Sequence, residues 1–156
     1  MKNKKGISAI VATVLIILIT VAAVTILWMT IIPMVSDQLK EGTVCVDAIS
    51  EITIEDDGYT CYNSTSNQSR VRVGYGSKDV DLAGIQVLLS RDGDTINTTD
   101  VTNSTLLPGV NEERVLRINY PAAMGNPDSV KIAAIVNVGN SQVHCEPSTP
   151  VVLREC

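Results

Sequence analysis

The sequence predicts an α+β protein: a long N-terminal hydrophobic α-helix followed by an antiparallel β-sandwich-like globular domain. Residues 7–35 carry no charged side chain, and this run exceeds the roughly 20 residues with which a helix crosses a membrane. From residue 43 onward, short segments of alternating apolar and polar residues are separated by turn residues, as in an antiparallel sandwich. We therefore expect a basic leader at residues 1–6, a helix at residues 7–42 and a β-domain at residues 43–156.

The expected helix is apolar on every side. Sixteen of the 29 residues from 7 to 35 are Ile, Leu or Val. Each contributes about 0.3 to 0.6 kcal/mol to membrane insertion, so the run favours insertion by about 5 to 10 kcal/mol. The hydroxyls of its serine and threonines can bond to the preceding helical turn or to a neighbouring helix. Pro33 removes one helical hydrogen bond, so the helix either ends there or, as we expect, resumes until Gly42.

Charge is distributed unevenly along the chain. Lys2, Lys4 and Lys5 precede the apolar run without any acid, whereas residues 37–156 hold nine Lys or Arg and 17 Asp or Glu, a net charge of -8. Basic residues beside a membrane helix stay in the cytoplasm, so we expect a cytoplasmic N-terminus and an external β-domain. The acidic charge argues against nucleic acid as a partner, because neutralising phosphates needs a basic surface.

The first residues also carry a motif. A short basic leader ends in Gly6 and is followed directly by Ile-Ser-Ala-Ile-Val-Ala-Thr-Val-Leu. This start resembles the N-terminus of archaeal type IV pilins, a likeness that is close over residues 1–36 and only general beyond them. The resemblance implies that a prepilin peptidase recognises Lys4 and Lys5 and cuts between Gly6 and Ile7. The freed apolar helices would then bundle into the core of a filament.

One position departs from the bacterial members of that family. Bacterial type IV pilins have a glutamate five residues into the mature helix, where this chain has Val11. Archaeal members commonly lack that glutamate, so the difference favours an archaeal type and puts the bacterial mechanism of subunit registration in doubt. The apolar run is also about twice as long as the h-region of a cleavable secretory signal, so we expect no cut after it.

The resemblance implies a structural subunit of an archaeal type IV pilus-like surface filament, which polymerises with itself through residues 7–35 and serves adhesion. Its partners would be prepilin peptidase, the pilus assembly machinery and, before assembly, the cell membrane, whereas the mature filament would be extracellular. Two alternatives stay open. One is a single-pass membrane anchor whose β-domain binds a ligand or envelope partner as a monomer. The other is an archaellin-like subunit of a motility filament.

The β-domain is expected to contain about seven to nine short strands. Its longest apolar segment, residues 130–138, predicts a strand buried on both faces. Further strands are expected at residues 44–54, 59–62, 70–75, 85–89, 114–120, 142–145 and 151–153. Polar residues predict loops at 63–69 and 97–105, and turn-forming residues predict turns or loops at 55–58, 91–94, 106–110 and 121–127.

The cysteines lie in the part of the chain expected outside the cell, where disulfides persist. Four cysteines allow three connectivities, among which the sequence cannot choose. Our prediction is the most local one, which joins Cys45 to Cys61 and Cys145 to Cys156. No closely spaced C-x-x-C pair is present, which argues against a zinc site.

Four N-x-[ST] triplets make Asn63, Asn67, Asn97 and Asn103 candidate N-glycosylation sites. They cluster in two expected loops, where glycans would project into solvent and shield the surface. The alternative is that Asn, Ser and Thr are present simply because they form loops.

Nothing in the sequence predicts an enzyme, a cofactor or a metal site. His144 is the single histidine, and no nucleophile and orienting acid are placed around it as a catalytic triad requires. The acidic segments 55–57 and 92–100 do not match a calcium-binding loop, so we interpret them as solvated turns.

Overall fold

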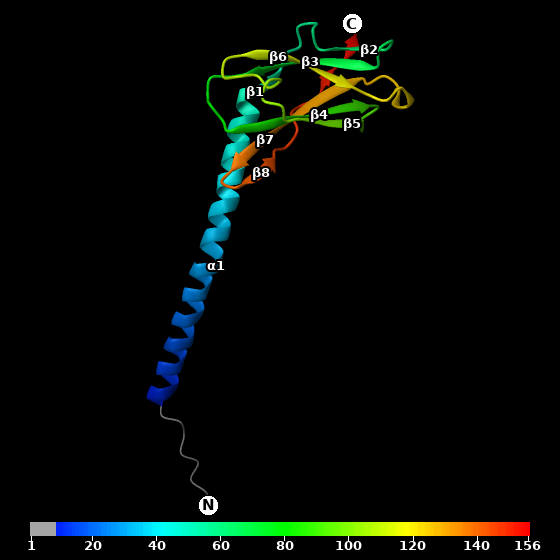
Figure 1. Cartoon of the computed structure of the whole chain (residues 1–156). Helices are drawn as coiled ribbons and strands as arrows, with labels where there is room; N and C mark the ends of the chain where they lie inside the picture. The colour runs from blue at the N-terminus through cyan, green and yellow to red at the C-terminus, as the bar shows by residue number, and fades with distance from the viewer. Residues whose placement is uncertain (1–8) are drawn as a thin grey trace, which may run out of the picture. The chain divides into compact units, whose positions relative to one another are not determined.

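The computed structural model describes residues 9–156, in which one helix, α1 (Ala9–Glu51), is followed by β-sheets built mainly from antiparallel strands (Figure 1). The predicted α+β fold class is therefore confirmed. The chain forms two compact units that divide between Lys40 and Glu41, inside α1. Among the described residues the first unit consists of helix, and the second contains the last turns of α1 and the strands.

The helix runs past its expected end at Gly42 as far as Glu51, and it also continues through Pro33. The resumption after Pro33 is confirmed, but the strand expected at residues 44–48 is wrong. Val44, Val46 and Ala48 gave an apparent alternation, yet Val44, Cys45 and Ala48 are the residues that pack on the core, at the spacing of a helix face. This packing offsets the cost of about 1 kcal/mol for having Gly42 inside the helix.

The strands of the second unit form two sheets. Sheet A has β3 (Gln68–Tyr75) at its centre, with β6 along one side and β1 and β2 along the other. Strand β10 joins β2 in a parallel pairing. The flanking strands are β1 (Ile52–Ile54), β2 (Cys61–Asn63), β6 (Glu113–Asn119) and β10 (Arg154–Glu155).

Sheet B has the strand order β5-β4-β7-β8, and β9 also pairs with β7. Its strands are β4 (Leu82–Arg91), β5 (Asp94–Val101), β7 (Ser129–Val138), β8 (Ser141–His144) and β9 (Val151–Val152). In Figure 1, β3 and β6 lie in one layer and β4, β5 and β7 in the other. A short 3-10 helix (Ala122–Met124) lies between β6 and β7.

The hydrophobic core lies between the two sheets. Val71 and Val73 of β3 and Val87 and Leu89 of β4 are fully buried and belong to one cluster. These positions alternate with more exposed ones, as expected for strands that bury one face. Strand β7 differs because every residue from 132 to 136 is buried, which confirms the predicted strand with two covered faces.

The polar segment at residues 97–105 is only partly a loop, because β5 extends to Val101. This strand pairs with β4 at the edge of sheet B. Its apolar pattern is weak because an edge strand keeps much of its surface in water, and threonine favours strands without being apolar. Polar side chains on such an edge also hinder pairing with strands of other molecules.

The predicted disulfide pairing is wrong. Cys45 is bonded to Cys145, and Cys61 is bonded to Cys156. The local pairing assumed that Cys45 and Cys61 lie on neighbouring strands, but Cys45 lies on α1. The observed bonds join residues 100 and 95 positions apart. They link the beginning of the second unit to its end.

The last turns of α1 are fixed to the strands of the second unit by more than the disulfide of Cys45. The ammonium nitrogen of Lys78 lies 2.6 Å from a carboxylate oxygen of Asp47. The backbone N–H of Gly76 donates to the carbonyl of Glu51 over 2.8 Å. A side chain at Gly76 would collide with the Glu51 carboxylate, so glycine permits this close approach.

The core predicts a clear contrast between two leucines. Leu89→Ala removes a side chain that is 0% exposed, whereas Leu106→Ala makes the same change at a side chain that is 53% exposed. We expect the first to lower the free energy of unfolding by about 2 to 5 kcal/mol and the second to change it by less than about 0.5 kcal/mol. Urea unfolding of the detergent-solubilised protein, followed by the near-UV circular dichroism of the buried tyrosines, measures both. Equal effects would contradict the assigned core.

The disulfides predict a specific peptide map. Proteolysis without reductant should release a peptide containing Cys45 joined to one containing Cys145, and a second pair containing Cys61 and Cys156. Replacing Cys45 and Cys145 together by serine should destabilise the domain by about 3 to 4 kcal/mol, because with Cys61–Cys156 intact this bond closes an unfolded-chain loop of about 30 residues. Recovery of Cys45 linked to Cys61 would contradict the structure.

Candidate functional site

The most distinctive surface of the chain is the apolar part of α1. Every residue from 10 to 35 is exposed in the isolated chain, and none of them is charged. Among the described residues, one helix is long and apolar enough to cross a membrane, with a mean hydropathy of 3.0 in its most apolar window. Soluble monomers rarely expose an apolar surface of this extent, so lipid or protein must cover it.

The threonine hydroxyls of this surface are satisfied within the helix. The hydroxyls of Thr13, Thr20, Thr25 and Thr30 each donate to a backbone carbonyl three or four residues earlier, over 2.9 Å. Of the two bonding modes that the sequence left open, the structure contains the one to the preceding turn. These hydroxyls therefore require no partner outside the helix, and the surface can face hydrocarbon or other apolar side chains equally well.

The predicted cleavage site between Gly6 and Ile7, and the recognition residues Lys4 and Lys5, lie outside the described residues. The cleavage therefore stays a prediction from the sequence.

The four candidate glycosylation sites occupy different environments. Asn63 ends β2, and its side-chain oxygen accepts hydrogen bonds from the backbone N–H groups of Thr65 and Ser66, both at 3.0 Å. Asn67 lies in the turn before β3 with a positive φ of 49°. Both are half-buried. They share one turn, as the sequence suggested.

Asn97 and Asn103 do not share a loop. Asn97 lies within β5 and is half-buried. Its amide nitrogen donates to the carbonyl of Asn119 over 3.3 Å, which links the edges of the two sheets. Asn103 is exposed in the loop after β5, where its side-chain oxygen accepts from the backbone N–H of Thr105. A glycan at Asn97 would have to replace the contact with Asn119, whereas Asn103 offers free access.

We therefore expect unequal glycan occupancy. In protein purified from a glycosylating host, glycopeptide mass spectrometry should find higher occupancy at Asn103 than at Asn97. The variant Asn103→Gln should remove the corresponding mass without affecting folding, because this side chain is exposed. Preferential occupancy of Asn97 would contradict the hydrogen bond that the structure places between β5 and β6.

An open cleft of about 650 Å³ lies beside the loop between β3 and β4. The Tyr75 hydroxyl fixes this loop, because it accepts from the N–H of Val80 over 2.6 Å and donates to the Val80 carbonyl over 2.8 Å. Burial raises the pKa of Tyr75. The charged lining consists of Asp79, Asp81, Glu112 and Arg114, with no histidine, lysine or cysteine in it.

His144 and the acidic segments 55–57 and 92–100 do not line this cleft. His144 is exposed on β8. Within residues 9–156, no three His, Cys, Asp or Glu side chains are grouped so that they could hold a metal ion. Asp128 is held by the backbone N–H of Asp92 at 2.7 Å and by the hydroxyl of Ser129. These bonds lower the pKa of Asp128 and make it a structural link between two loops.

One set of charged residues escaped the sequence analysis. Arg70, Arg117 and Arg154 occupy one cross-strand row on sheet A. Arg70 and Arg117 each alternate with buried residues along a strand, so both lie on its solvent face. Their alignment depends on strand register, which the sequence does not contain.

Comparisons with known proteins leave the chain without a match: no protein-family model, no curated protein and no solved structure is significantly similar to it.

Proposed function

We propose that this chain is a structural subunit of a surface filament resembling an archaeal type IV pilus, and that the filament serves adhesion. The observation that carries the proposal is the fully apolar, uncharged surface of residues 10–35, whose threonine hydroxyls are all bonded within the helix. Such a surface dissolves in lipid before assembly. It can then pack against identical helices without leaving a threonine hydroxyl unpaired.

The start of the sequence supports the same proposal. A basic leader that ends in Gly6 before the apolar run fits cleavage by a prepilin peptidase on the cytoplasmic side. The proposed order of events is insertion with the N-terminus in the cytoplasm, removal of residues 1–6, and transfer of the helix from the membrane into the filament by the assembly machinery. The β-domain would remain outside throughout, where its two disulfides are stable.

The competing function is a single-pass anchor that presents the β-domain as a monomer. The second unit has its own core and both disulfides, so it does not require a filament in order to fold. The two functions differ in what residues 10–35 contact after maturation. An anchor keeps them in lipid, and a filament subunit transfers them to other copies of the chain.

A lysine in the middle of the apolar surface separates these functions. Ile17→Lys should abolish filaments, because a filament core offers the ammonium group no water and no counter-charge. The variant should still enter the membrane, because one lysine costs about 2.5 to 3.5 kcal/mol against the roughly 5 to 10 kcal/mol that favour insertion. Electron microscopy of sheared surface material and membrane fractionation measure the two effects, and N-terminal sequencing of the filaments should begin at Ile7.

Ile17→Leu is the matched control, since it keeps the apolar surface and should leave filaments intact. A wild-type protein that keeps Met1 and that mild detergent extracts from the membrane only as monomers would favour the anchor instead. Normal filament formation by the Ile17→Lys variant would contradict the proposal that residues 10–35 form the filament core.

A further inference from the structure

The outer face of sheet A carries three arginines in register. Arg117 of β6 lies directly opposite Arg70 of β3, Arg70 lies opposite Cys61 of β2, and Cys61 lies beside Arg154 of β10. Paired residues of neighbouring strands share a face, and strands are about 4.8 Å apart. The backbone positions of Arg117, Arg70 and Arg154 therefore span about 15 Å. All three side chains are exposed. We refer to these three residues as the arginine row.

No carboxylate within residues 9–156 forms a salt bridge with the arginine row. The neighbouring Arg72 shows the contrast. Its guanidinium pairs with both Asp57 and Glu113, and the hydrogen bond that it donates to Glu113 is the main reason that the pKa of Arg72 is raised. This face thus neutralises one arginine with two acids and leaves three arginines without any.

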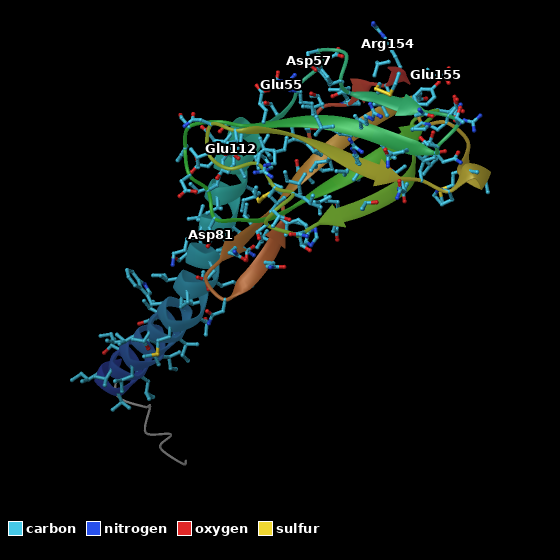
Figure 2. All side chains as sticks on the ribbon, turned by 45° about the horizontal axis from the view of Figure 1, so that its top comes forward. Glu55, Asp57, Asp81, Glu112, Arg154 and Glu155 are labelled. Carbon is cyan, nitrogen blue, oxygen red and sulfur yellow. A yellow bond between two sulfur atoms is a disulfide. The ribbon has the colours of Figure 1, made fainter. Side chains whose placement is uncertain are left out.

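The acids that lie near Arg154 in Figure 2 are held by other groups. Asp57 is paired with Arg72, Glu55 accepts a hydrogen bond from the Thr53 hydroxyl, and Glu155 accepts one from the Ser64 hydroxyl. Figure 2 also shows Arg154 extending outward, away from the ribbon of the sheets. The row therefore presents free guanidinium groups to solvent on a unit that is otherwise acidic.

Repulsion between the arginines destabilises the sheet. Protection of the sheet edges against unwanted strand pairing does not explain why all three are present. Like charges directly opposite each other on paired strands are destabilising, and Arg70 faces Arg117 in this way. Charged side chains on β6 and β10 could hinder unwanted strand pairing, but Arg70 lies on β3, at the centre of the sheet. An anionic ligand would relieve the repulsion at all three positions.

The Cys61–Cys156 disulfide holds the third arginine in the row. It joins β2 to the segment that follows Arg154, and the backbone N–H of Cys156 donates to the carbonyl of Tyr62 over 2.9 Å. Without this bond, the two residues of β10 would have little to keep them beside β2, because so short a strand is a frayed end. The covalent link therefore fixes the spacing between Arg154 and Arg70.

The next row on the same face is uncharged and rich in amides. Asn63, Gln68 and Asn119 are in register, and the Gln68 amide donates to Asn119 over 3.0 Å. The two rows contain no large apolar residue that could anchor a protein partner, since Cys61 is buried, and protein interfaces need an apolar centre. Guanidinium groups match carboxylates in bidentate geometry, and amides can bond hydroxyl groups.

We propose that the outer face of sheet A is a binding site for a polysaccharide that carries carboxylate groups. The arginine row binds carboxylates of successive sugars, and the adjacent amide row bonds their hydroxyls. This inference rests on the adhesive part of the proposed function and names the class of polymer to which the filament adheres. It does not depend on how the subunits assemble, because every residue involved belongs to residues 41–156 of one chain.

The test uses the full chain as a monomer in detergent, with immobilised polygalacturonate as the probe and uncharged dextran as the reference polymer. Wild-type protein should bind polygalacturonate and not dextran, and the affinity should fall as salt is raised. Replacing Arg70, Arg117 and Arg154 together by glutamine should weaken binding at least about tenfold, because charge-assisted hydrogen bonds are lost. Filament formation by this variant should be unchanged, which separates the site from assembly.

A second triple variant controls for net charge. Arg91→Gln, Lys131→Gln and Lys40→Gln together remove the same charge outside the arginine row, and this protein should bind like the wild type. Near-UV circular dichroism checks that each variant is folded, and Arg154→Gln alone, at an exposed position, provides the test if the triple variant does not fold.

Three results would overturn the proposal. The first is a wild-type protein that does not bind polygalacturonate at low salt. The second is an equal loss of binding in both triple variants. The third is self-association of the wild type that the arginine-row variant abolishes while polygalacturonate binding stays the same, which would assign the row to acidic groups on a second copy.

Discussion

The apolar side chains of residues 10–35 must be kept away from water. This requirement limits the environments in which the chain can exist to those that cover the helix. The helix has no charged residue in this stretch, and its threonines bond to their own backbone. Lipid and a bundle of identical helices satisfy the requirement equally well, because neither has to supply hydrogen bonds to the threonine hydroxyls. A surface whose threonine hydroxyls need no outside partner can pass from one environment to the other.

The second unit meets a different requirement, which is to fold in an aqueous medium from a small number of residues. Its core is formed between two sheets and includes Ala48 from the last turns of α1. The Cys45–Cys145 disulfide and the contacts of Glu51 and Asp47 hold those turns against the strands. The end of the helix is thus part of the core of the globular unit. The acidic exterior keeps this unit soluble, and the arginine row is the local exception on sheet A.

The sequence predicted the features that depend on local composition. The apolar run, the α+β class and the buried strand at residues 130–138 all follow from the residues themselves. Residues 44–48 were misjudged because Val44, Val46 and Ala48 occupy every second position by coincidence, while Val44, Cys45 and Ala48 form the helix face that meets the core. Such a short segment fits both periods, and only contacts with the strands decide between them.

Features that depend on strand register could not be predicted. Cys45 and Cys145 meet because α1 enters the core, and Arg70 and Arg117 meet because β3 and β6 pair in one particular alignment. A shift of one residue would turn Arg70 inward. Of the two candidate sites, the apolar helix surface was evident from composition, whereas the arginine row exists only after the sheet has formed.

The connectivity of the disulfides also bears on when the protein can mature. Each bond joins a cysteine near the start of the second unit to one near residue 150, and the two bonds interleave along the chain. In a chain that enters the membrane by α1 first, Cys45 and Cys61 emerge long before Cys145 and Cys156. Oxidation at that early stage would favour a bond between the first two cysteines, which is not one of the native pairs. In the export pathway proposed above, native pairing would require thiol oxidation to wait until residue 156 is outside, or an isomerase to correct the premature bond.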